Sequence, residues 1–463
     1  MNGPSLLLTT LASLTVVTWF VVLILGRPVR ARLTPQLIVG ALIWTMGASS
    51  LLLALIPRTS LNVVVPGELP SALPPNFVAA SHFVNALFLV SLALGLAYVS
   101  ITHLPRRPGK SIWITGLLLT FAFSLSAFFG TVPDYEWKLV IWPLTITVVY
   151  LLPRVPLRWL VRQLQHLFMI TVVGSLAAWL LSPHWALSSG GAGPSSFLDR
   201  SLRLQGLTQQ ANGMGEVALL GLLATYWLKE GRFRRISLGL CLLALVLSGS
   251  RTAIFALPLC LACLWVYKAR ANRSIRMTSV VVLFGISAVG VAYESLAGFT
   301  GSGNGFTANL GTLNGRTQVW SLTLDQWRQN PVVGYGLTLW SAAYRANHGF
   351  SNLSWVGMAH NQFIQALGET GLVGLVALVA FVLALVGWAW RSRPVDQGLA
   401  LSLVLALLVI MITEAPDVAG GLPVALYPVF AVVIVTMTSA SLNRPGDRPA
   451  DPAPPVVSSI NRS

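Results

Sequence analysis

Arginine, histidine and amide side chains gather in one polar stretch of an otherwise apolar chain. The stretch contains Asn314-Gly-Arg-Thr-Gln-Val-Trp320, Asn330-Pro-Val-Val-Gly-Tyr-Gly336 and Ala359-His-Asn-Gln-Phe-Ile-Gln-Ala-Leu-Gly-Glu-Thr-Gly371. Arginine is a permanently charged, planar fork for phosphate oxygens, and histidine is a base suited to neutral pH. Because polar groups are costly near a bilayer, we expect this stretch to carry chemistry.

Further polar residues lie outside this stretch. Arg251 stands alone between two apolar runs in Ser248-Gly-Ser-Arg-Thr252, which favours a functional role over membrane anchoring. The segment Arg203-Leu-Gln-Gly-Leu-Thr-Gln-Gln-Ala-Asn212 leads into a run that carries Glu216 one turn later. Glu216 and Glu414 lie in or at the ends of apolar runs, and they either pair with the arginines or belong to the site.

Metal and redox motifs are missing from the sequence. The six histidines form no H-x-x-x-H pattern, and none has an acidic residue at ligand spacing. Cys260 and Cys263 form a C-x-x-C within an apolar run, without the strand and turn of a redox motif, so we interpret them as packing thiols. The sequence therefore predicts neither a metal nor another cofactor.

The composition is that of a membrane protein. Hydrophobic residues make up 55% of the 463 residues, charged residues 10%, and the mean hydropathy is +0.72. Apolar windows long enough to span a bilayer recur at 5–26, 35–56, 77–101, 111–132, 139–153, 167–183, 213–229, 236–250, 252–267, 277–297, 370–390, 398–415 and 420–440. The weakest are 139–153, which is short, and the pair separated by Arg251. We predict an all-α polytopic membrane protein with about 12–13 transmembrane helices and a large outward-facing loop between the helices near 297 and 370.

The placement of basic residues indicates an orientation. If the N-terminus is outside, the inner loops carry all 30 Lys and Arg residues except Arg58, Lys138, Arg200, Arg203, Arg251, Arg316, Arg328 and Arg345. The positive-inside rule selects this orientation and places the polar stretch outside. The net charge of +16 then reflects topology and attraction to anionic lipid rather than nucleic-acid binding.

The chain divides into three predicted parts. Residues 1–200 are N-terminal transmembrane helices, beginning with an uncleaved first helix because Arg27 and Arg30 follow it and no basic residue precedes it. Residues 201–441 form a core that includes the outward loop 298–369, and 442–463 are a Pro-rich, disordered cytoplasmic tail.

Several arginines, one histidine, no metal and an outer-leaflet position fit a glycosyltransferase that uses a lipid-linked diphosphate. Arginines can stabilise the charge on a leaving diphosphate in place of Mg²⁺. A histidine can activate the acceptor hydroxyl as a general base. The partners expected are the lipid-linked glycan donor, an acceptor glycan or glycolipid and the bilayer.

Three motifs in this order resemble the O-antigen ligase and polymerase family over residues 200–390. They are Ser-Arg at a helix junction, Gly-Arg-Thr-x-x-Trp leading to Pro-x-x-Gly-x-Gly, and His-Asn followed by Glu-Thr-Gly-Leu-x-Gly. The resemblance implies transfer of a glycan from undecaprenyl diphosphate to an acceptor sugar at the outer face of the bacterial cytoplasmic membrane, without a metal or nucleotide sugar. Carried over by motif, Arg251 and Arg316 would bind the diphosphate, and His360 would act as general base or orient the acceptor. Supporting roles fall to Arg203, Asn212, Glu216, Tyr335, Asn361 and Glu369.

Two alternatives stay open beside an O-antigen ligase acting in lipopolysaccharide or surface polysaccharide synthesis. A polymerase uses the same donor and extends another lipid-linked repeat unit instead of lipid A-core. A transporter or flippase of lipid-linked sugars predicts charges near the bilayer midplane and a path open to both faces. A purely structural scaffold predicts no convergence of Arg251, Arg316 and His360, whereas the enzyme predicts that all three meet at the outer boundary.

Overall fold

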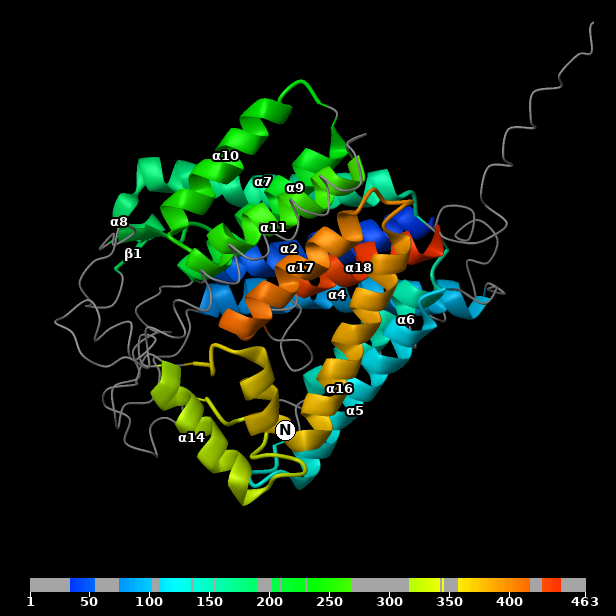
Figure 1. Ribbon diagram of the computed structural model, residues 1–463, viewed down its shortest axis with the longest axis vertical. Helices are drawn as coiled ribbons and strands as arrows, with labels where there is room; N and C mark the ends of the chain where they lie inside the picture. The colour runs from blue at the N-terminus through cyan, green and yellow to red at the C-terminus, as the bar shows by residue number, and fades with distance from the viewer. Residues whose placement is uncertain are drawn as a thin grey trace, which may run out of the picture.

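Long apolar runs fold as helices throughout the part of the chain that the computed structural model describes. That part comprises residues 34–54, 75–101, 108–134, 137–153, 155–189, 202–208, 210–229, 231–268, 316–341, 344, 357–416 and 427–442. The first half forms α2 (Pro35–Ala54), α4 (Pro75–Ile101), α5 (Lys110–Phe129), the 3-10 turn η1 (Trp137–Val140), α6 (Ile141–Leu151), α7 (Leu157–Leu181) and the short α8 (Pro183–Ala186). These helices lie together in one bundle with the second half of the chain (Figure 1).

The second half begins with a short antiparallel ribbon. Strand β1 (Leu187–Ser189) pairs with β2 (Leu202–Leu204), so that Ser188 lies opposite Arg203. The helices that follow are α9 (Ala211–Leu228), α10 (Arg234–Ser248), α11 (Arg251–Lys268), α14 (Arg316–Gln329), α16 (Gln362–Ser392), α17 (Leu399–Thr413) and α18 (Tyr427–Ser441).

The predicted all-α membrane fold is confirmed. Every apolar window that falls within the described residues contains a helix, including the short 139–153 and the pair separated by Arg251. The windows 5–26 and 277–297 lie outside the described residues, as do residues 298–315, 342–343 and 345–356 of the outward loop and nearly all of the tail. Among the described residues four helices are long and apolar enough to cross a membrane, and shorter apolar helices are present as well, for example α17 and α18.

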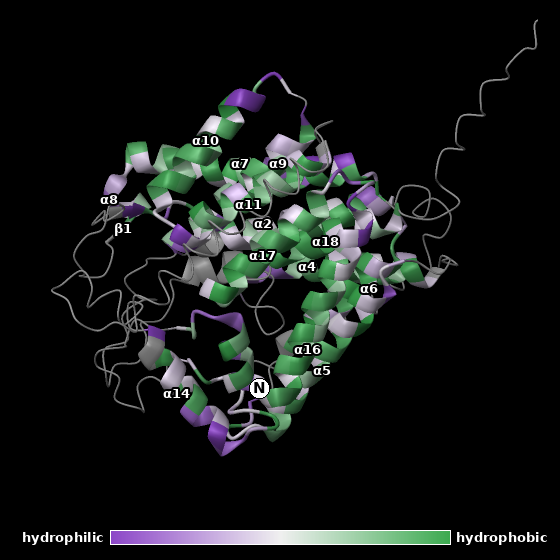
Figure 2. Cartoon of the chain, in the orientation of Figure 1, coloured by the Kyte–Doolittle hydropathy of each residue, from purple (hydrophilic) through white to green (hydrophobic). Residues whose placement is uncertain are grey.

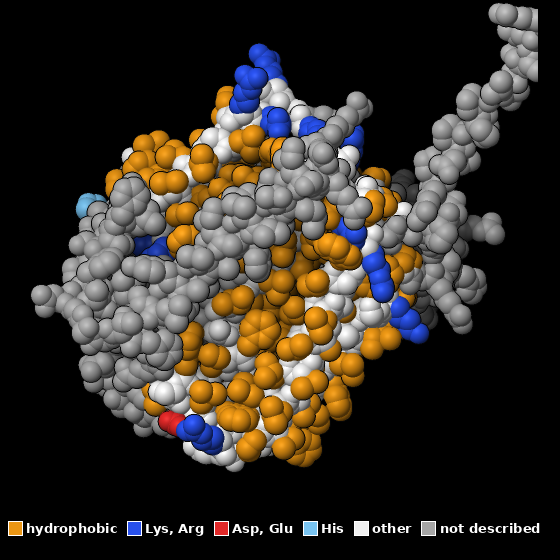
Figure 3. All heavy atoms as spheres, in the orientation of Figure 1, with side chains coloured by type: hydrophobic (Ala, Val, Ile, Leu, Met, Phe, Trp, Pro, Cys, Tyr) orange, Lys and Arg blue, Asp and Glu red, His pale blue; other side chains and the backbone are white. Residues whose placement is uncertain are grey.

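The centre of the bundle is apolar on all sides. Helix α17 contacts α11, α16, α18 and α9, and ten of its fifteen residues are buried, as expected for a helix at the centre of a bundle. Apolar side chains instead face outward along α16 and α5, among them Phe121, Val376 and Leu383 (Figure 3). Hydrophilic residues concentrate at helix ends and in α14 (Figure 2), as expected for a bundle whose sides contact lipid.

A backbone clasp ties α14 to α16 and α5. The segment after α14 runs beside α16, where the Tyr335 N–H donates to the Gly368 carbonyl at 2.8 Å and the Leu372 N–H to the Pro331 carbonyl at 2.9 Å. On its other side the Val132 N–H, just beyond α5, donates to the Tyr335 carbonyl at 2.8 Å. The Pro-x-x-Gly-x-Gly pattern therefore forms a turn and a short loop between α16 and the end of α5.

Glycine makes this close approach possible. Gly371 interrupts the helical backbone of α16 with φ +63°, and a Cβ there would lie 2.3 Å from the Val332 carbonyl oxygen. Gly334 faces it with φ +77°, and a Cβ there would lie 2.6 Å from the Gly371 nitrogen. Both positions need a left-handed backbone and no side chain, which only glycine supplies without strain.

Gly371→Ala should therefore destabilise the protein by about 1–3 kcal/mol, because alanine adds both a strained φ and a clash with backbone atoms. Thermal unfolding in detergent, followed by intrinsic fluorescence, measures the effect. Gly387→Ala in the same helix is the matched control, since nothing lies within 4 Å of a Cβ there. Equal unfolding midpoints for the two variants would show that the break in α16 carries no strain.

Candidate active site

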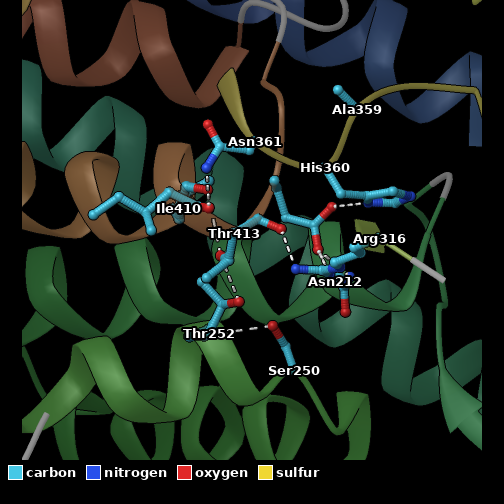
Figure 4. Close-up of polar contacts among 12 residues, drawn as sticks. Asn212, Ser250, Thr252, Arg316, Ala359, His360, Asn361, Ile410 and Thr413 are labelled. Atoms are coloured by element: carbon cyan, nitrogen blue, oxygen red, sulfur yellow. Dashed lines mark hydrogen bonds and ion pairs between the residues drawn. The ribbon is translucent and has the colours of Figure 1, made fainter. Parts of the chain in front are cut away.

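Glu414 lies at the centre of a polar cluster where several helices end. It follows α17 directly, and only 6% of its side chain is exposed. Its Oε1 accepts from Arg316 Nη2 at 2.9 Å and from Asn212 Nδ2 at 2.6 Å, and its Oε2 lies 2.8 Å from His360 Nδ1. One carboxylate thus joins residues from α9, α14 and the start of α16 (Figure 4).

Two side chains fix the backbone of Ala359, the residue before His360. Ala359 donates its N–H to Gln365 Oε1 at 2.6 Å and accepts at its carbonyl from Trp320 Nε1 at 2.8 Å. His360 itself adopts a left-handed backbone, φ +51°. This conformation is uncommon for residues other than glycine and persists where neighbouring contacts fix it.

Asn361 starts helix α16 and attaches it to α17. Its Oδ1 accepts from the N–H groups of Phe363 and Ile364, as an N-cap does, and its Nδ2 donates to the Ile412 carbonyl at 3.0 Å. The His-Asn pair therefore has two distinct positions: histidine at the cluster, and asparagine at the cap that anchors it.

Arg316 connects α14 to the end of α17. Besides its ion pair with Glu414, its Nη1 donates to the Thr413 carbonyl at 2.6 Å. Arg316 is the first described residue of α14, and Glu414 supplies the negative charge that compensates its guanidinium.

Arg203 and Asn212 extend the cluster toward α10 and α9. Arg203 Nη2 donates to Asn212 Oδ1 at 2.5 Å, and its Nε donates to the Ser248 carbonyl at 2.8 Å. Arg251 begins α11 immediately after this turn, and its charge, like that of Arg316, acts on Arg203. Thr252 and Thr413 join their hydroxyls at 2.7 Å and so link α11 to the end of α17.

The charges around Glu414 determine its ionisation. Burial alone would raise the pKa of Glu414, but its hydrogen bond to His360 and the positive charges of His360 and Arg316 outweigh burial and lower the pKa below its usual value. Burial also lowers the pKa of Arg203, reinforced by Arg251 and Arg316 and opposed by Glu414. Glu414 is therefore an anion at neutral pH within a mainly cationic cluster.

The structure places the remaining sequence candidates around this cluster. Glu216 is buried in α9 one turn after Asn212. Tyr335 belongs to the backbone clasp and packs edge-on against Tyr344. Glu369 accepts from Gln365 Nε2, and Gln365 Oε1 in turn accepts from the Ala359 N–H next to His360.

Sequence reasoning left Glu414 undecided between partner and site residue, and it missed Trp320, Gln365 and Thr413 as contributors. The signal for Glu414 was an acidic residue directly after a strongly apolar run. No comparable signal marks Gln365, whose partners depend on how the chain folds. Among the described residues no group of histidine, cysteine and acidic side chains is arranged to hold a metal ion.

These features define a class: a multi-pass helical membrane protein with a cationic polar cluster at one end of the bundle. Residues 236–379 match the family described as O-antigen ligase, so this part of the chain is similar to that family. The match includes Arg251, Arg316 and His360, whereas Arg203, Asn212 and Glu414 lie outside it. No curated protein matches the chain.

Glu414→Gln should weaken the cluster, because the amide keeps the shape of the carboxylate and loses its charge. If the cluster performs glycosyl transfer, the rate should fall by roughly 10²–10⁴-fold, as when a neutral amide replaces the carboxylate that orients a catalytic histidine. The stabilisation from a carboxyl with a lowered pKa is present above its unfolded-state pKa of about 4.3 and is lost as pH falls through the folded-state value. The free energy of unfolding should therefore fall less steeply in Glu414→Gln than in wild type as the pH is lowered into the acid range.

Asp396→Asn is the matched control for that measurement. Asp396 is a buried acid at the opposite end of α17, where its carboxylate accepts from the Gly398 and Ala400 N–H groups. Burial raises the pKa of Asp396 to about 6, so its charged form is already disfavoured and an amide should be tolerated. Equal loss of transfer in both variants would remove Glu414 from any special role.

Proposed function

We propose that the protein is a glycosyltransferase of the O-antigen ligase type. It transfers a glycan from undecaprenyl diphosphate to an acceptor hydroxyl at the outer face of a bacterial cytoplasmic membrane, using no metal and no nucleotide sugar. The observation that carries the proposal is that Arg316 and His360 bind the same buried carboxylate, Glu414, at one end of an apolar helix bundle. A phosphate-binding cation and a proton acceptor are thereby held side by side.

The arginines serve the donor. Arg251 and Arg316 lie on two different helices, α11 and α14, and the charges of both act on Arg203. Guanidinium groups bind phosphate oxygens with two parallel hydrogen bonds and keep their charge at any physiological pH. They would stabilise the charge that develops on the diphosphate as it leaves, which is the largest electrostatic demand of the reaction.

His360 serves the acceptor. With its Nδ1–H donated to Glu414, the opposite ring nitrogen, Nε2, carries the lone pair. The acceptor hydroxyl oxygen forms a bond to the anomeric carbon of the donor sugar, and its proton passes to Nε2. The bond between that carbon and the diphosphate oxygen breaks, and the diphosphate leaves with the electron pair. Glu414 stabilises the imidazolium that results.

The orientation of the helices supports an outward site. The cluster lies where α9 and α11 begin and where α10 and α17 end, while Lys229, Arg234, Lys268 and Arg391 lie at the opposite ends of these helices and of α16. Basic residues favour the cytoplasmic side. The cluster then faces outward, near the diphosphate of a lipid carrier whose chain lies in the bilayer.

The acceptor separates two versions of this function. A ligase delivers the glycan to lipid A-core, and a polymerase delivers it to a second lipid-linked repeat unit. Both need the same arginines and histidine. A transporter or flippase of lipid-linked sugars is less favoured, because the charged residues gather at one end of the bundle rather than near its middle.

His360→Ala should abolish transfer while the protein stays folded and inserted. The test is reconstitution in proteoliposomes with an undecaprenyl diphosphate-linked glycan and, separately, lipid A-core or a second lipid-linked glycan as acceptor. The acceptor that wild-type protein extends distinguishes a ligase from a polymerase. His184→Ala, at an exposed histidine of α8, is the matched control. Transfer retained by His360→Ala would remove this histidine from the catalytic step.

Arg316→Lys should reduce transfer by about 10-fold or more, since a single ammonium group does not reproduce the planar fork that bridges phosphate and Glu414. Arg328→Lys in the same helix is the control, because that side chain is exposed and paired with Asp325. Initial rates at varied donor concentration give the measurement. If lysine serves as well as arginine at position 316, the diphosphate assignment fails.

A further inference from the structure

Arg203 reaches the cluster from a different part of the fold than the other arginines. It lies on β2, and its guanidinium crosses to the end of α10 and the start of α9. The loop after β2 is fixed in turn: Gly206 has φ +53° and packs on Ser175 of α7, whose hydroxyl accepts from the Leu207 N–H at 2.8 Å. Helix α7 therefore fixes the loop that follows Arg203.

The first partner of Arg203 belongs to the turn that presents Arg251. Its Nε donates to the carbonyl of Ser248, the last residue of α10. Gly249 follows with φ +57°, and a Cβ there would lie 3.2 Å from Arg203 Nε. On the other side, a Cβ on Gly215 of α9 would lie 2.3 Å from Ser250 Cβ. The turn is held between Arg203 and α9.

The second partner leads to the histidine. Arg203 Nη2 donates to Asn212 Oδ1, and Asn212 Nδ2 donates to Glu414 Oε1. Arginine only donates and an ionised carboxylate only accepts, so an amide between them has a single orientation. Glu414 then holds His360 at Nδ1. A continuous chain of hydrogen bonds runs from Arg203 to the imidazole.

We propose that Arg203 is a positioning residue and not a ligand of the donor diphosphate. It joins the turn before Arg251 to the Asn212–Glu414 pair that orients His360, so that the donor-binding and proton-accepting groups keep one relative geometry. This role rests on the glycosyl transfer proposed above. In this proposal Arg251 and Arg316 bind phosphate, whereas Arg203 binds other residues of the same chain.

The test compares Arg203→Gln and Asn212→Ala with Arg316→Gln in proteoliposomes. Arg203→Gln and Asn212→Ala should lower kcat by about 10–100-fold and leave the KM for donor and the Kd for undecaprenyl diphosphate within about 3-fold of wild type. Combining the two should cost no more than the worse single change, because both break the same chain. Arg316→Gln should instead raise the donor Kd. Arg328→Gln is the surface control.

Separate outcomes identify separate failures. A donor Kd raised about 10-fold or more in Arg203→Gln, with effects additive to Asn212→Ala, would overturn the positioning role and leave glycosyl transfer intact. Wild-type protein that neither binds undecaprenyl diphosphate nor transfers glycan would sink the proposed function, and this inference with it. Asn212→Ala guards against misfolding, since it leaves the Arg203 contact with Ser248 in place.

Discussion

A buried carboxylate requires compensation, and the polar end of this bundle is arranged around that requirement. Glu414 is almost completely enclosed, and an unpaired charge in such a position would cost several kcal/mol. Its compensation comes from Arg316, His360 and Asn212, each on a different element. Removing any of these partners leaves a charge that the surroundings do not solvate. The need to compensate this carboxylate therefore favours a fold in which groups far apart in the chain lie together.

Rigid supports keep that meeting geometrically fixed. Asn361 caps α16 while binding the end of α17, and Gln365 and Trp320 hold the peptide before His360. At Gly334 and Gly371 the clasp attaches the segment after α14 to α16 by backbone hydrogen bonds. A site built on helix ends and on such supports keeps its geometry better than one on free loops. The motif glycines serve this attachment rather than binding a ligand directly.

Much of this architecture could be predicted from the sequence, because helix position depends on local apolar runs. The window 398–415 contains α17, the window 370–390 lies within the longer α16, and the weak pair on either side of Arg251 proved to be two helices. The clasp could not be predicted: its glycines stand in the sequence, but the pairing of Pro331 with Leu372 depends on tertiary structure. The same holds for Asn212 and Glu414, which are 202 positions apart in the chain. Arg316 and His360 stood out through their residue type, whereas Gln365 and Trp320 look like ordinary residues of amphipathic helices.

The balance of charge in the cluster bears directly on its substrate. The charges of Arg251 and Arg316 both act on Arg203, and Glu414 offsets this positive charge through its ion pair with Arg316 and its effect on Arg203. Arg251 also begins a helix, where the dipole adds to the repulsion. Such an arrangement lowers its energy when a further anion arrives. A diphosphate supplies two adjacent anionic groups, and its lipid chain keeps it at the membrane surface. The excess of positive charge is therefore better explained by the diphosphate that we propose as the substrate than by the stability of the fold.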